Sequence, residues 1–335
     1  MKNILFFDSD YDLKKFFSNC SIEGHDFIFF DEPFYYISPQ KLKNYLESEI
    51  ISVFTHSISI PNKKLDLFPN LKLIVTRSTG INHIDLDYCK KRGILVANVP
   101  QYGAITVAEF GFALLLALVR KIPQASFDMR RGDINLPLYT GIDLAGKTMG
   151  VIGTGSIGRH MIQLAQGFGM DVLAYDLYPA PDLKKFYVSS LQELYQKSDI
   201  ISLNVPSTPE NYHLLNKEAF SCMKKGVYII NTARGDLIDA RALYQAIRHG
   251  KVAGAGLDVM ENEDFLVHDE AETSSNLNNS DFLLTSAINL KLLQLSNVIA
   301  TPHIAFNSYD AIQRINATTC ENIRSFLAGK PINTK

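Results

Sequence analysis

The stretch VIGTGSIGRH, residues 151–160, contains three glycines spaced as GxGxxG between an apolar run and a helix-compatible segment. Gly153 and Gly155 allow a tight turn and a close approach of the backbone to a pyrophosphate, and Gly158 allows a helix and a strand to pack closely. The helix that follows points its N-terminus at the phosphates. A glycine triplet alone is a weak signal, but this strand–turn–helix context predicts a dinucleotide-binding turn.

Asp176 ends the next apolar run, eighteen residues after Gly158. A carboxylate at this position accepts hydrogen bonds from ribose hydroxyls and repels a 2′-phosphate. The neighbouring Leu177 and Tyr178 supply no positive charge that would attract such a phosphate. The pattern therefore predicts NAD rather than NADP as the cofactor.

Apolar runs separated by helix-compatible segments extend on both sides of the glycine turn. The series that begins with the turn's own strand predicts the six strands of a doubly wound dinucleotide-binding sheet: Met149–Ile152, Val172–Tyr175, Ile200–Leu203, Val227–Ile230, Ala253–Val259 and Asn297–Ala300. An earlier series predicts a second parallel sheet covered by helices: Ile4–Phe7, Phe27–Phe30, Ile51–Phe54, Leu71–Val75 and Ile94–Val99, with Ser38–Ser48 among the helix-compatible segments.

Two helices are expected where the chain passes between these series. Gly103–Lys121 is typical of one long helix that Pro123 ends, and this helix could link two domains. Ser308–Leu327 is typical of a final helix that returns to the first domain. The polar stretch Val267–Asp281 is expected to be a surface loop or a lid over a cleft.

Length and composition limit the class of protein. A chain of 335 residues with 46% hydrophobic and 20% charged residues is expected to form two globular domains. The 33 Lys and Arg against 35 Asp and Glu give a net charge of -2, which favours neither nucleic acid nor an anionic membrane as a partner. A small-molecule ligand is therefore expected.

The cysteines and the apolar runs indicate a cytoplasmic protein. Cys20, Cys89, Cys222 and Cys320 show no CxxC or CxxH pairing, which argues against a zinc site and against a disulfide scaffold. The N-terminus lacks the apolar region of a signal peptide, and the longest apolar run, Phe110–Val119, is too short to span a bilayer. We expect a soluble protein with reduced thiols and no bound metal.

Polar or glycine residues follow the ends of several apolar runs. In an open α/β sheet, ligands bind outside the carboxyl ends of the strands, so these residues are expected to meet in one crevice. They are Ser78, Thr79, Gly80, Asn204, Val205, Pro206, Thr232, Ala233, Arg234, Asp258, Thr301, Pro302 and His303.

Arg234 follows directly after a buried run, in NTARGDLID. A guanidinium is costly to bury without an anion, and its planar fork matches a carboxylate held by two hydrogen bonds. The structural alternative is an ion pair with Asp236 or Asp239. Arg234 is therefore a candidate for binding a substrate carboxylate.

His303 follows the last apolar run, in NVIATPHIAF, and a lone histidine there most often caps a strand end. Glu261 and Glu263 follow another run, where a lone glutamate is commonly a solvated loop residue. Reduction of a 2-keto acid needs a cation for the carboxylate and a proton donor for the carbonyl oxygen. A histidine beside a carboxylate can supply that proton, which favours His303 as the acid and one of the glutamates as its partner.

Five stretches taken together resemble the D-isomer-specific 2-hydroxy acid dehydrogenases, and within that family the D-lactate dehydrogenase branch. They are TRSTGINHIDLDYCKKRGILVANVPQY, VIGTGSIGR, NTARGDLID, GAGLDVMENE and TPHIAF. The resemblance extends from about residue 50 to residue 330. Its motifs, in this order, are highly specific as a set.

The resemblance implies a role for each matching residue. Arg234 would bind the substrate, His303 would donate the proton, and Glu263 would be its partner because the family's glutamate is the later of the two acids. The backbone of Ser78, Thr79 and Gly80 would hold the substrate carboxylate, and Tyr102 would line the pocket. The residues implied to contact NAD are Gly153, Gly155, Ser156, Ile157, Gly158, Asp176, Val205, Pro206, Asn211, Thr232, Ala233 and Asp258.

The resemblance also implies the domain organisation. Residues 1–101 and 303–335 would form a flavodoxin-like catalytic domain, and residues 102–302 a Rossmann domain that binds NAD. A homodimer would be built around the NAD-binding domain and the long helix after Tyr102. Three positions depart from the commoner family pattern: Asn204 replaces a histidine, Ser156 an arginine and Asp264 a proline.

The expected activity is NAD-dependent interconversion of a 2-keto acid and its D-2-hydroxy acid, with pyruvate and D-lactate as the first candidates. A glyoxylate or hydroxypyruvate reductase, or a dehydrogenase of the D-2-hydroxyisocaproate type, is the alternative among enzymes. A non-catalytic NAD-sensing scaffold is the alternative from another class, because the family includes transcriptional corepressors. Those contain extra partner-binding segments, which this compact chain lacks.

Overall fold

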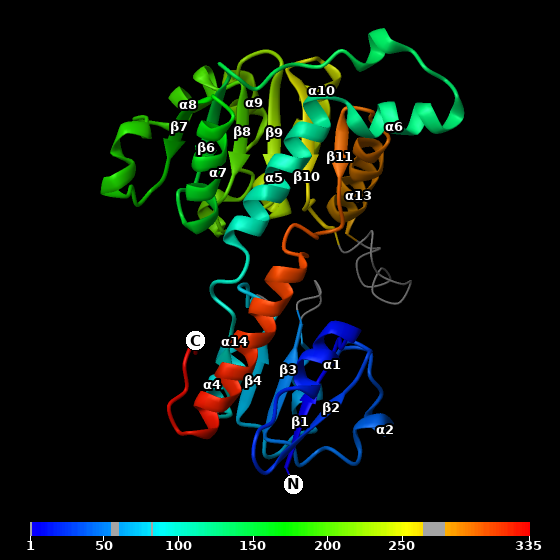
Figure 1. The fold of residues 1–335 in the computed structure, drawn as a ribbon, viewed down its shortest axis with the longest axis vertical. Coiled ribbons are helices and arrows are strands. Elements are labelled where there is room, and N and C mark those ends of the chain that lie inside the picture. Colours follow the sequence, from blue (N-terminus) through cyan, green and yellow to red (C-terminus); the bar gives the residue numbers. More distant parts are fainter. Residues whose placement is uncertain (1, 55–59, 82, 264–278) are drawn as a thin grey trace. The chain divides into compact units, whose positions relative to one another are not determined.

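The computed structural model describes residues 2–54, 60–81, 83–263 and 279–335. The chain divides into two compact units (Figure 1). Unit 1 comprises residues 1–102 and 307–335, and unit 2 comprises residues 103–306. Among the described residues, no helix is both long enough and apolar enough to cross a membrane.

Unit 1 is built on a parallel sheet of five strands in the order β2-β1-β3-β4-β5, which is the flavodoxin-like order. All five predicted strands are found: β1 (Lys2–Phe6), β2 (His25–Phe29), β3 (Ile50–Val53), β4 (Leu73–Thr76) and β5 (Leu95–Ala97). The helices are α1 (Tyr11–Ser18), α2 (Pro39–Leu42), α3 (Asn62–Leu65), α4 (Leu86–Lys91) and α14 (Tyr309–Leu327).

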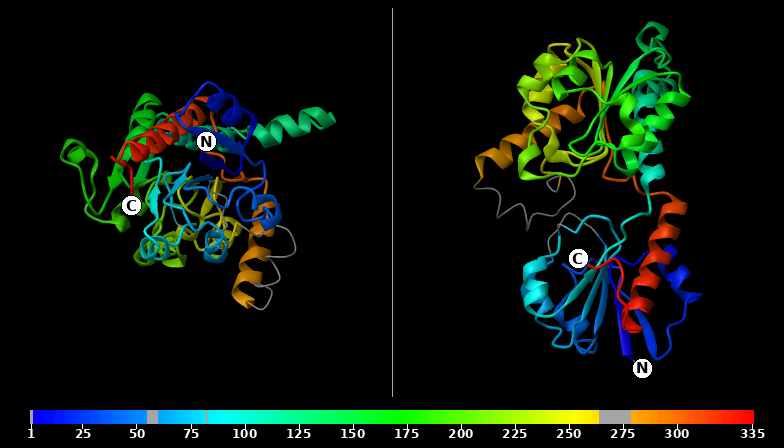
Figure 2. Two further views of the ribbon diagram at one scale, coloured as in Figure 1. Left: turned by 90° about the horizontal axis from the view of Figure 1, so that it is seen from below. Right: turned by 90° about the vertical axis from the view of Figure 1, so that its left-hand side faces the viewer.

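Helices cover both faces of this sheet, as Figure 2 shows. Alternate residues of a strand point to opposite faces, and β1 follows this rule. Ile4 and Phe6 pack in one buried cluster with residues of α1 and α14. Leu5 packs in the other cluster, with residues of α2, α3 and α4. This double burial explains why the strands are almost continuously apolar.

The helices of unit 1 agree with the sequence only in part. The final helix is confirmed, since the Ser308 side chain accepts a hydrogen bond from the Ala311 N–H and α14 ends at Leu327. The sequence is compatible with a helix throughout Ser38–Ser48, but only Pro39–Leu42 is helical. After Leu42, the N–H groups of Tyr45 and Ser48 donate to the carbonyls three residues earlier, which is turn rather than α-helix geometry.

Unit 2 is built on six parallel strands in the order β11-β10-β9-β8-β6-β7. These are the six predicted strands: β6 (Thr148–Ile152), β7 (Asp171–Tyr175), β8 (Ile200–Leu203), β9 (Val227–Asn231), β10 (Val252–Leu257) and β11 (Val298–Ala300). The chain leaves β6 for β7 on one side and returns to β8 on the other, which is the switch point where such sheets bind ligands. Both sheets are doubly wound, as predicted.

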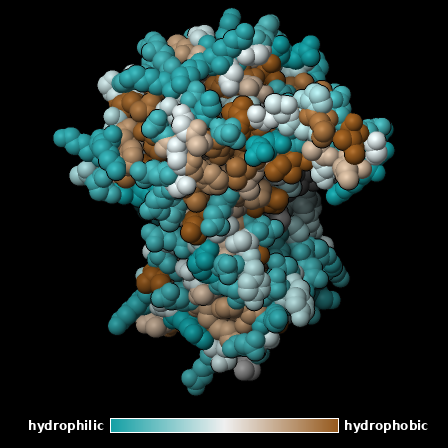
Figure 3. Space-filling model, turned by 45° about the horizontal axis from the view of Figure 1, so that its top comes forward, coloured by the Kyte–Doolittle hydropathy of each residue, from teal (hydrophilic) through white to brown (hydrophobic). Residues whose placement is uncertain are grey.

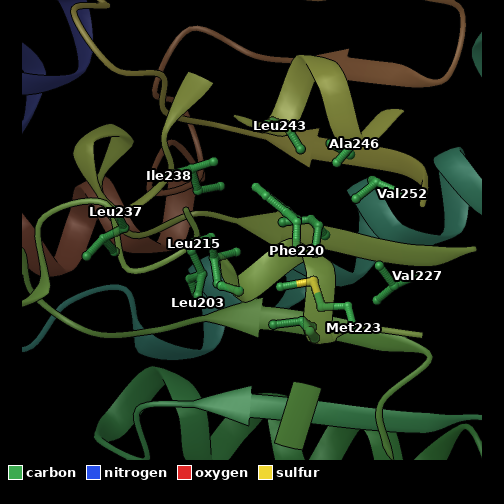
Figure 4. Close-up of a cluster of buried hydrophobic side chains, with 14 of the residues drawn as sticks. Leu203, Leu215, Phe220, Met223, Val227, Leu237, Ile238, Leu243, Ala246 and Val252 are labelled. Atoms are coloured by element: carbon green, nitrogen blue, oxygen red, sulfur yellow. The ribbon is translucent and has the colours of Figure 1, made fainter. Parts of the chain in front are cut away.

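The helices of unit 2 cover both faces of its sheet. They are α5 (Ala104–Val119), α6 (Ile122–Arg131), α7 (Ser156–Gly167), α8 (Leu191–Lys197), α9 (Lys217–Cys222), α10 (Ala240–Arg248) and α13 (Ser280–Leu293). Single turns of 3-10 helix add Leu136–Tyr139, Pro181–Phe186, Pro209–Asn211 and Gly235–Leu237. Phe220, Met223 and Leu237 lie in the core under β8 and β9 (Figure 4). That core anchors the turn that follows Arg234, because Leu237 is fully buried.

Three boundaries differ from the sequence analysis. Pro123 does not end the long helix: α5 already ends at Val119, and Pro123 lies in the first turn of α6, where a missing N–H costs nothing. The stretch Val267–Asp281 lies outside the described residues as far as residue 278, and its last two residues begin α13. His303 to Phe306 belong to unit 2, because Asp258 holds this segment by hydrogen bonds.

The glycine turn between β6 and α7 tolerates no side chain at Gly158. A Cβ there would lie 1.9 Å from the Gly153 carbonyl oxygen, and that backbone atom cannot move aside. We expect Gly158→Ala to lower the free energy of unfolding by at least ~3 kcal/mol, measured by urea denaturation. Gly155→Ala is the matched control, since its Cβ would meet nothing within 4 Å. Equal stability of the two variants would contradict this packing.

Candidate active site

Arg234, Glu263 and His303 follow three adjacent strands of unit 2. In the register of the sheet, Asn231 of β9 pairs with Leu257 of β10, and Leu257 pairs with Ala300 of β11. The three side chains come three, six and three residues after these paired positions. The parallel sheet therefore brings all three segments to the same edge.

Glu263 and His303 form a direct pair. The His303 Nδ1 and the Glu263 Oε1 are 2.9 Å apart. The other carboxylate oxygen accepts a hydrogen bond from the Met260 N–H at 3.0 Å, which fixes the orientation of the glutamate. The His303 side chain is 43% exposed, and within the described residues its Nε2 has no hydrogen-bond partner. A proton on Nε2 can thus reach a ligand, while Nδ1 is engaged.

A buried carboxylate shapes the backbone around His303. Asp258 has no exposed surface and accepts hydrogen bonds from the Thr301 hydroxyl and from the N–H groups of Ile304 and Ala305. Burial raises the pKa of the Asp258 carboxyl, and these three hydrogen bonds act in the opposite direction. The His303 N–H donates to the Asp258 carbonyl, and His303 has a φ of 54°, in the left-handed region. Asp258 therefore positions His303, and it offers no surface for the predicted contact with NAD.

Arg234 lies in a turn that Asn231 organises. The buried Asn231 side chain accepts from the Ala233 N–H at 3.0 Å and donates to the Arg234 carbonyl at 2.8 Å. The guanidinium donates one hydrogen bond, to the Ala233 carbonyl at 2.7 Å. Among the described residues it forms no ion pair, so most of its donors are available to a ligand anion.

Neither of the acids considered as a partner for Arg234 fills that role. Asp236 accepts a hydrogen bond from the Ser207 hydroxyl, and Asp239 caps α10 through the N–H groups of Arg241 and Ala242. The turn after Arg234 packs instead against the segment before Glu263. A Cβ on Gly235 would lie 2.1 Å from the Met260 carbonyl carbon, so this contact requires glycine.

The two glutamates have separate partners, which decides between them. The Glu261 carboxylate accepts from the Tyr212 hydroxyl at 2.9 Å and lies 2.7 Å from the His213 Nε2. Burial, together with this bond to Glu261, raises the pKa of Tyr212 to about 12. The Asn289 side chain donates to the Glu261 carbonyl. Glu261 therefore anchors the turn that presents Glu263, and only Glu263 pairs with His303.

Sequence reasoning missed Tyr212, His213, Asn289 and Asn231. The first three meet Glu261 across separations of 28 to 49 residues, and no local spacing signals such contacts. Asn231 had a signal, since a polar residue that ends a buried strand must find partners. It adjoins the predicted strand end Thr232, Ala233 and Arg234.

The glycine turn has the features of a phosphate cradle. Gly153 has a φ of 90°, and a Cβ there would lie 2.4 Å from the Asn204 carbonyl oxygen. Gly155 and Ser156 are exposed at the N-terminal end of α7, while Ile157 is partly buried. Open space at Gly155 and the unpaired N–H groups of the helix start suit a pyrophosphate.

Asp176 lies directly after β7 and stays charged. One carboxylate oxygen accepts from the Thr154 N–H and hydroxyl, and the other accepts from the Tyr178 N–H at 2.9 Å. Burial acts to raise the pKa of Asp176, but these hydrogen bonds outweigh it and the pKa is lowered. The neighbouring Leu177 and Tyr178 are largely exposed, so the carboxylate borders solvent beside the glycine turn.

The remaining residues predicted to contact NAD lie at the ends of β8 and β9. Val205 and Pro206 follow β8, and a Cβ on Gly153 would lie 2.6 Å from the Val205 side chain. The Asn211 side chain is used within its own loop, donating to the Pro206 carbonyl and accepting from the Thr208 N–H. Thr232 and Ala233 are partly exposed in the turn before Arg234.

The residues predicted to bind the substrate carboxylate lie in unit 1, after β4. The Ser78 hydroxyl donates to the Gly80 carbonyl at 2.6 Å, and the Thr79 hydroxyl donates to the Val99 carbonyl at 2.9 Å. The Asn98 side chain donates to the Thr79 carbonyl, so the turn is rigidly held. Tyr102 is the last residue of this segment, and its carbonyl accepts from the Arg314 Nε.

Comparison with known proteins gives consistent matches. Residues 112–305 match the family model of the D-isomer specific 2-hydroxyacid dehydrogenase, NAD binding domain. The chain is 40% identical over 263 residues to a D-lactate dehydrogenase of Escherichia coli, covering 78% of this chain and 77% of that protein. It is 39% identical over 261 residues to an aromatic 2-oxoacid reductase of Clostridium sporogenes, covering 76% of each.

A solved structure matches almost the whole chain. The D-lactate dehydrogenase from Aquifex aeolicus, complexed with NAD and lactic acid, superposes with a TM-score of 0.82 at 38% sequence identity. The match covers 98% of this chain and 96% of that one. The likeness therefore includes both units and not only the glycine turn.

Proposed function

Because the chain belongs to the D-isomer specific 2-hydroxyacid dehydrogenases and is an NAD-dependent oxidoreductase of D-2-hydroxy acids, we propose that its substrate pair is pyruvate and D-lactate. Two relatives named D-lactate dehydrogenase support this choice. The observation that carries the proposal is the Glu263–His303 pair, whose Nε2 has no hydrogen-bond partner among the described residues, together with Arg234, which forms no ion pair among them. We further propose that unit 2 binds NAD and that unit 1 supplies the substrate-binding turn at residues 78–80.

The proposed roles follow from the geometry of each side chain. The Arg234 guanidinium holds the carboxylate of the keto acid by a forked pair of hydrogen bonds. The His303 Nε2 donates a proton to the carbonyl oxygen, and Glu263 holds the ring by Nδ1 so that Nε2 faces the substrate. When bound, NADH supplies the hydride that arrives at the carbonyl carbon. The reverse reaction returns the proton to Nε2.

The proposed binding of NAD depends on the glycine turn and on Asp176. The exposed start of α7 accommodates the pyrophosphate, and the charged Asp176 accepts hydrogen bonds from the adenosine ribose hydroxyls. A carboxylate at this position repels a 2′-phosphate, which favours NAD over NADP.

Replacement of Asp176 tests the proposed ribose contact. We expect Asp176→Ala to raise the KM for NADH roughly 10-fold and to narrow the preference for NADH over NADPH, because one charged hydrogen-bond acceptor is lost. Steady-state kinetics with both cofactors measures this. Asp171→Ala, at the exposed opposite end of β7, is the control and should change neither value. An unaltered cofactor preference in Asp176→Ala would remove the residue from the site.

A substrate panel tests the proposed reaction. NADH oxidation is followed with pyruvate, glyoxylate, hydroxypyruvate, 2-ketoisocaproate and phenylpyruvate, and we expect the highest kcat/KM with pyruvate and D-lactate as the product. A preference for phenylpyruvate would instead align the chain with the aromatic 2-oxoacid reductase it resembles. Absence of turnover with every keto acid would favour a non-catalytic NAD-sensing scaffold.

We also propose a homodimer that uses the arm formed by α6 and the turn Leu136–Tyr139. Large apolar side chains are exposed along this arm, where Figure 3 shows apolar atoms gathering: Ile122, Phe127, Met129, Ile134, Leu136 and Leu138. Six exposed large apolar side chains on one short segment are typical of a subunit interface.

The dimer is tested by charging the arm. We expect the double variant Leu136→Asp, Leu138→Asp to sediment as a monomer, because a subunit interface would have to bury two unpaired carboxylates. Analytical ultracentrifugation measures this. Tyr11→Asp, at a 75% exposed position of unit 1, is the control and should leave the assembly unchanged. A double variant that sediments like the unmodified protein would exclude the arm as the interface.

We propose a cytoplasmic location. The four cysteines are free thiols, which persist in a reducing compartment. Cell fractionation tests this, since recovery in the periplasmic fraction would contradict it.

A further inference from the structure

Two cysteines that are 300 residues apart in the sequence lie side by side in unit 1. The Sγ atoms of Cys20 and Cys320 are 2.7 Å apart. Cys20 lies in the turn after α1, held by a hydrogen bond from its N–H to the Phe17 carbonyl. Cys320 is a buried residue of α14. A disulfide has an S–S length of ~2.05 Å, so bond formation requires the sulfurs to approach by only about 0.7 Å.

A surface pocket gives small molecules access to this pair. Its volume is about 640 Å³, and both cysteines line it. Cys20 is partly exposed, whereas only 5% of Cys320 is exposed. All residues of the pocket belong to unit 1. A reagent in the pocket therefore meets Cys20 first, with Cys320 directly behind it.

The Arg324 guanidinium contacts the sulfur of Cys20, the more exposed of the two cysteines. Arg324 Nη2 donates to the Cys20 Sγ at 3.4 Å and to the Ser21 carbonyl at 3.2 Å, so the guanidinium is held in place. Arg324 lies one helical turn after Cys320, on the same side of α14. Lys15, Asp12 and Glu321 also line the pocket, but among the charged side chains that the structure describes there, only the arginine bonds this sulfur. The arginine therefore lies against the more accessible of the two sulfurs.

The second sulfur has the opposite environment. Burial, together with the hydrogen bond to Cys20, raises the pKa of Cys320 to about 12. Cys320 therefore stays a thiol. A reactive, accessible cysteine beside a resolving thiol is the arrangement found in redox-sensing sites.

We infer that Cys20 and Cys320 are a redox-active dithiol, which a hydroperoxide converts into a reversible intramolecular disulfide. The Cys20 thiolate attacks one peroxide oxygen, which breaks the O–O bond, gives a sulfenic acid and releases hydroxide. The Cys320 sulfur then attacks the sulfenic sulfur and forms the S–S bond. The Cys320 proton and the sulfenic OH leave as water. Two thiols are oxidised and one hydrogen peroxide is reduced to two waters, and an external dithiol reverses the change.

The disulfide would connect the two chain segments of unit 1 covalently. Cys20 belongs to the first segment, residues 1–102, and Cys320 to the second, residues 307–335. The closed loop of about 300 residues restricts the unfolded chain strongly, which stabilises the folded unit. This inference does not depend on the substrate proposed above.

Thiol titration of the full-length protein tests the inference. The reduced protein is treated with an equimolar amount of hydrogen peroxide, and we expect the four free thiols to fall to two. Intact mass should decrease by about 2 Da, and peptide mapping should join the peptides of Cys20 and Cys320. Reduction with a phosphine should restore all four thiols. Retention of four thiols, or a bond between other cysteines, would overturn the inference.

Matched variants separate the pair from general oxidation. Cys20→Ser and Cys320→Ser should each abolish the mass loss, whereas Cys222→Ser should still lose two thiols. Among the described residues, neither Cys222 nor Cys89 lies within hydrogen-bonding distance of another sulfur. Arg324→Gln should slow disulfide formation roughly 10-fold, because the positively charged hydrogen-bond donor beside the Cys20 sulfur is lost. Circular dichroism confirms folding, and crosslink formation in a folded Cys20→Ser protein would refute the assignment.

Discussion

We expect replacement of His303 with alanine to lower kcat for pyruvate reduction at least ~100-fold and to leave the affinity for NADH unchanged. In the proposed mechanism, Nε2 donates the proton, while the glycine turn and Asp176, elsewhere in unit 2, are proposed to hold the cofactor. Stopped-flow and steady-state kinetics measure kcat, and quenching of NADH fluorescence measures its binding.

The environment of His303 sets the control for this experiment. His249→Ala removes an exposed imidazole that bonds only to the Gln245 carbonyl at the end of α10, and it should leave kcat unchanged. Circular dichroism and the thermal midpoint show whether His303→Ala is folded, because the Asp258 network holds the backbone and not the ring. A folded His303→Ala enzyme with normal kcat would exclude the residue as the acid.

We expect replacement of Arg234 with alanine to lower kcat/KM for pyruvate roughly 1000-fold, equivalent to about 4 kcal/mol. A substrate carboxylate loses both hydrogen bonds and the positive charge, and no other ion pair is broken among the described residues. Arg234→Lys keeps the charge but not the planar fork, so we expect a loss of roughly 100-fold. We therefore expect kcat/KM for pyruvate to fall in the order arginine, lysine, alanine at position 234, and this order separates the loss of the planar fork from the loss of the charge.

The control is an arginine outside the site. Arg241→Ala removes an exposed guanidinium on α10 that pairs with Asp281, and its kinetics should match the unmodified enzyme. NADH binding should stay intact in all Arg234 variants. If Arg234→Ala weakened NADH binding as much as pyruvate turnover, Arg234 would serve the cofactor and not the substrate carboxylate.

The two doubly wound parallel sheets and the glycine turn could be predicted from the sequence alone, because both depend on local patterns. Each near-continuous apolar run became a strand, and those inside the sheets, such as β3, β4 and β8, are buried on both faces because such a run has no polar side to expose to water. Gly153 and Gly158 approach each other within the turn itself, although Gly153 also packs closely against the distant Asn204. Asp176 follows a strand at a fixed distance from that turn, and it accepts hydrogen bonds from the nearby Tyr178 and, across 22 residues, from Thr154 of the turn.

Where local patterns were ambiguous, sequence reasoning erred. Pro123 is compatible both with the end of one helix and with the first turn of the next, since neither place needs its missing N–H. In the structure Lys121 adopts a left-handed conformation between the two helices, and Pro123 lies in the first turn of α6. The segment Ser38–Ser48 has helix-compatible residues throughout, yet only four of them, Pro39–Leu42, form a helix.

The family resemblance already selected Glu263 as the partner of His303, but the contact itself, like those of Arg234, is visible only in the three-dimensional structure. Glu261 and Glu263 are two residues apart and chemically identical, so spacing could not separate them. Glu261 pairs with His213, which lies 48 residues earlier in the chain. Glu263 pairs with His303. The same holds for Cys20 and Cys320, which nothing in their spacing connects. Contacts between distant segments depend on how strands and helices pack, and that information lies in the whole chain rather than in any window of it.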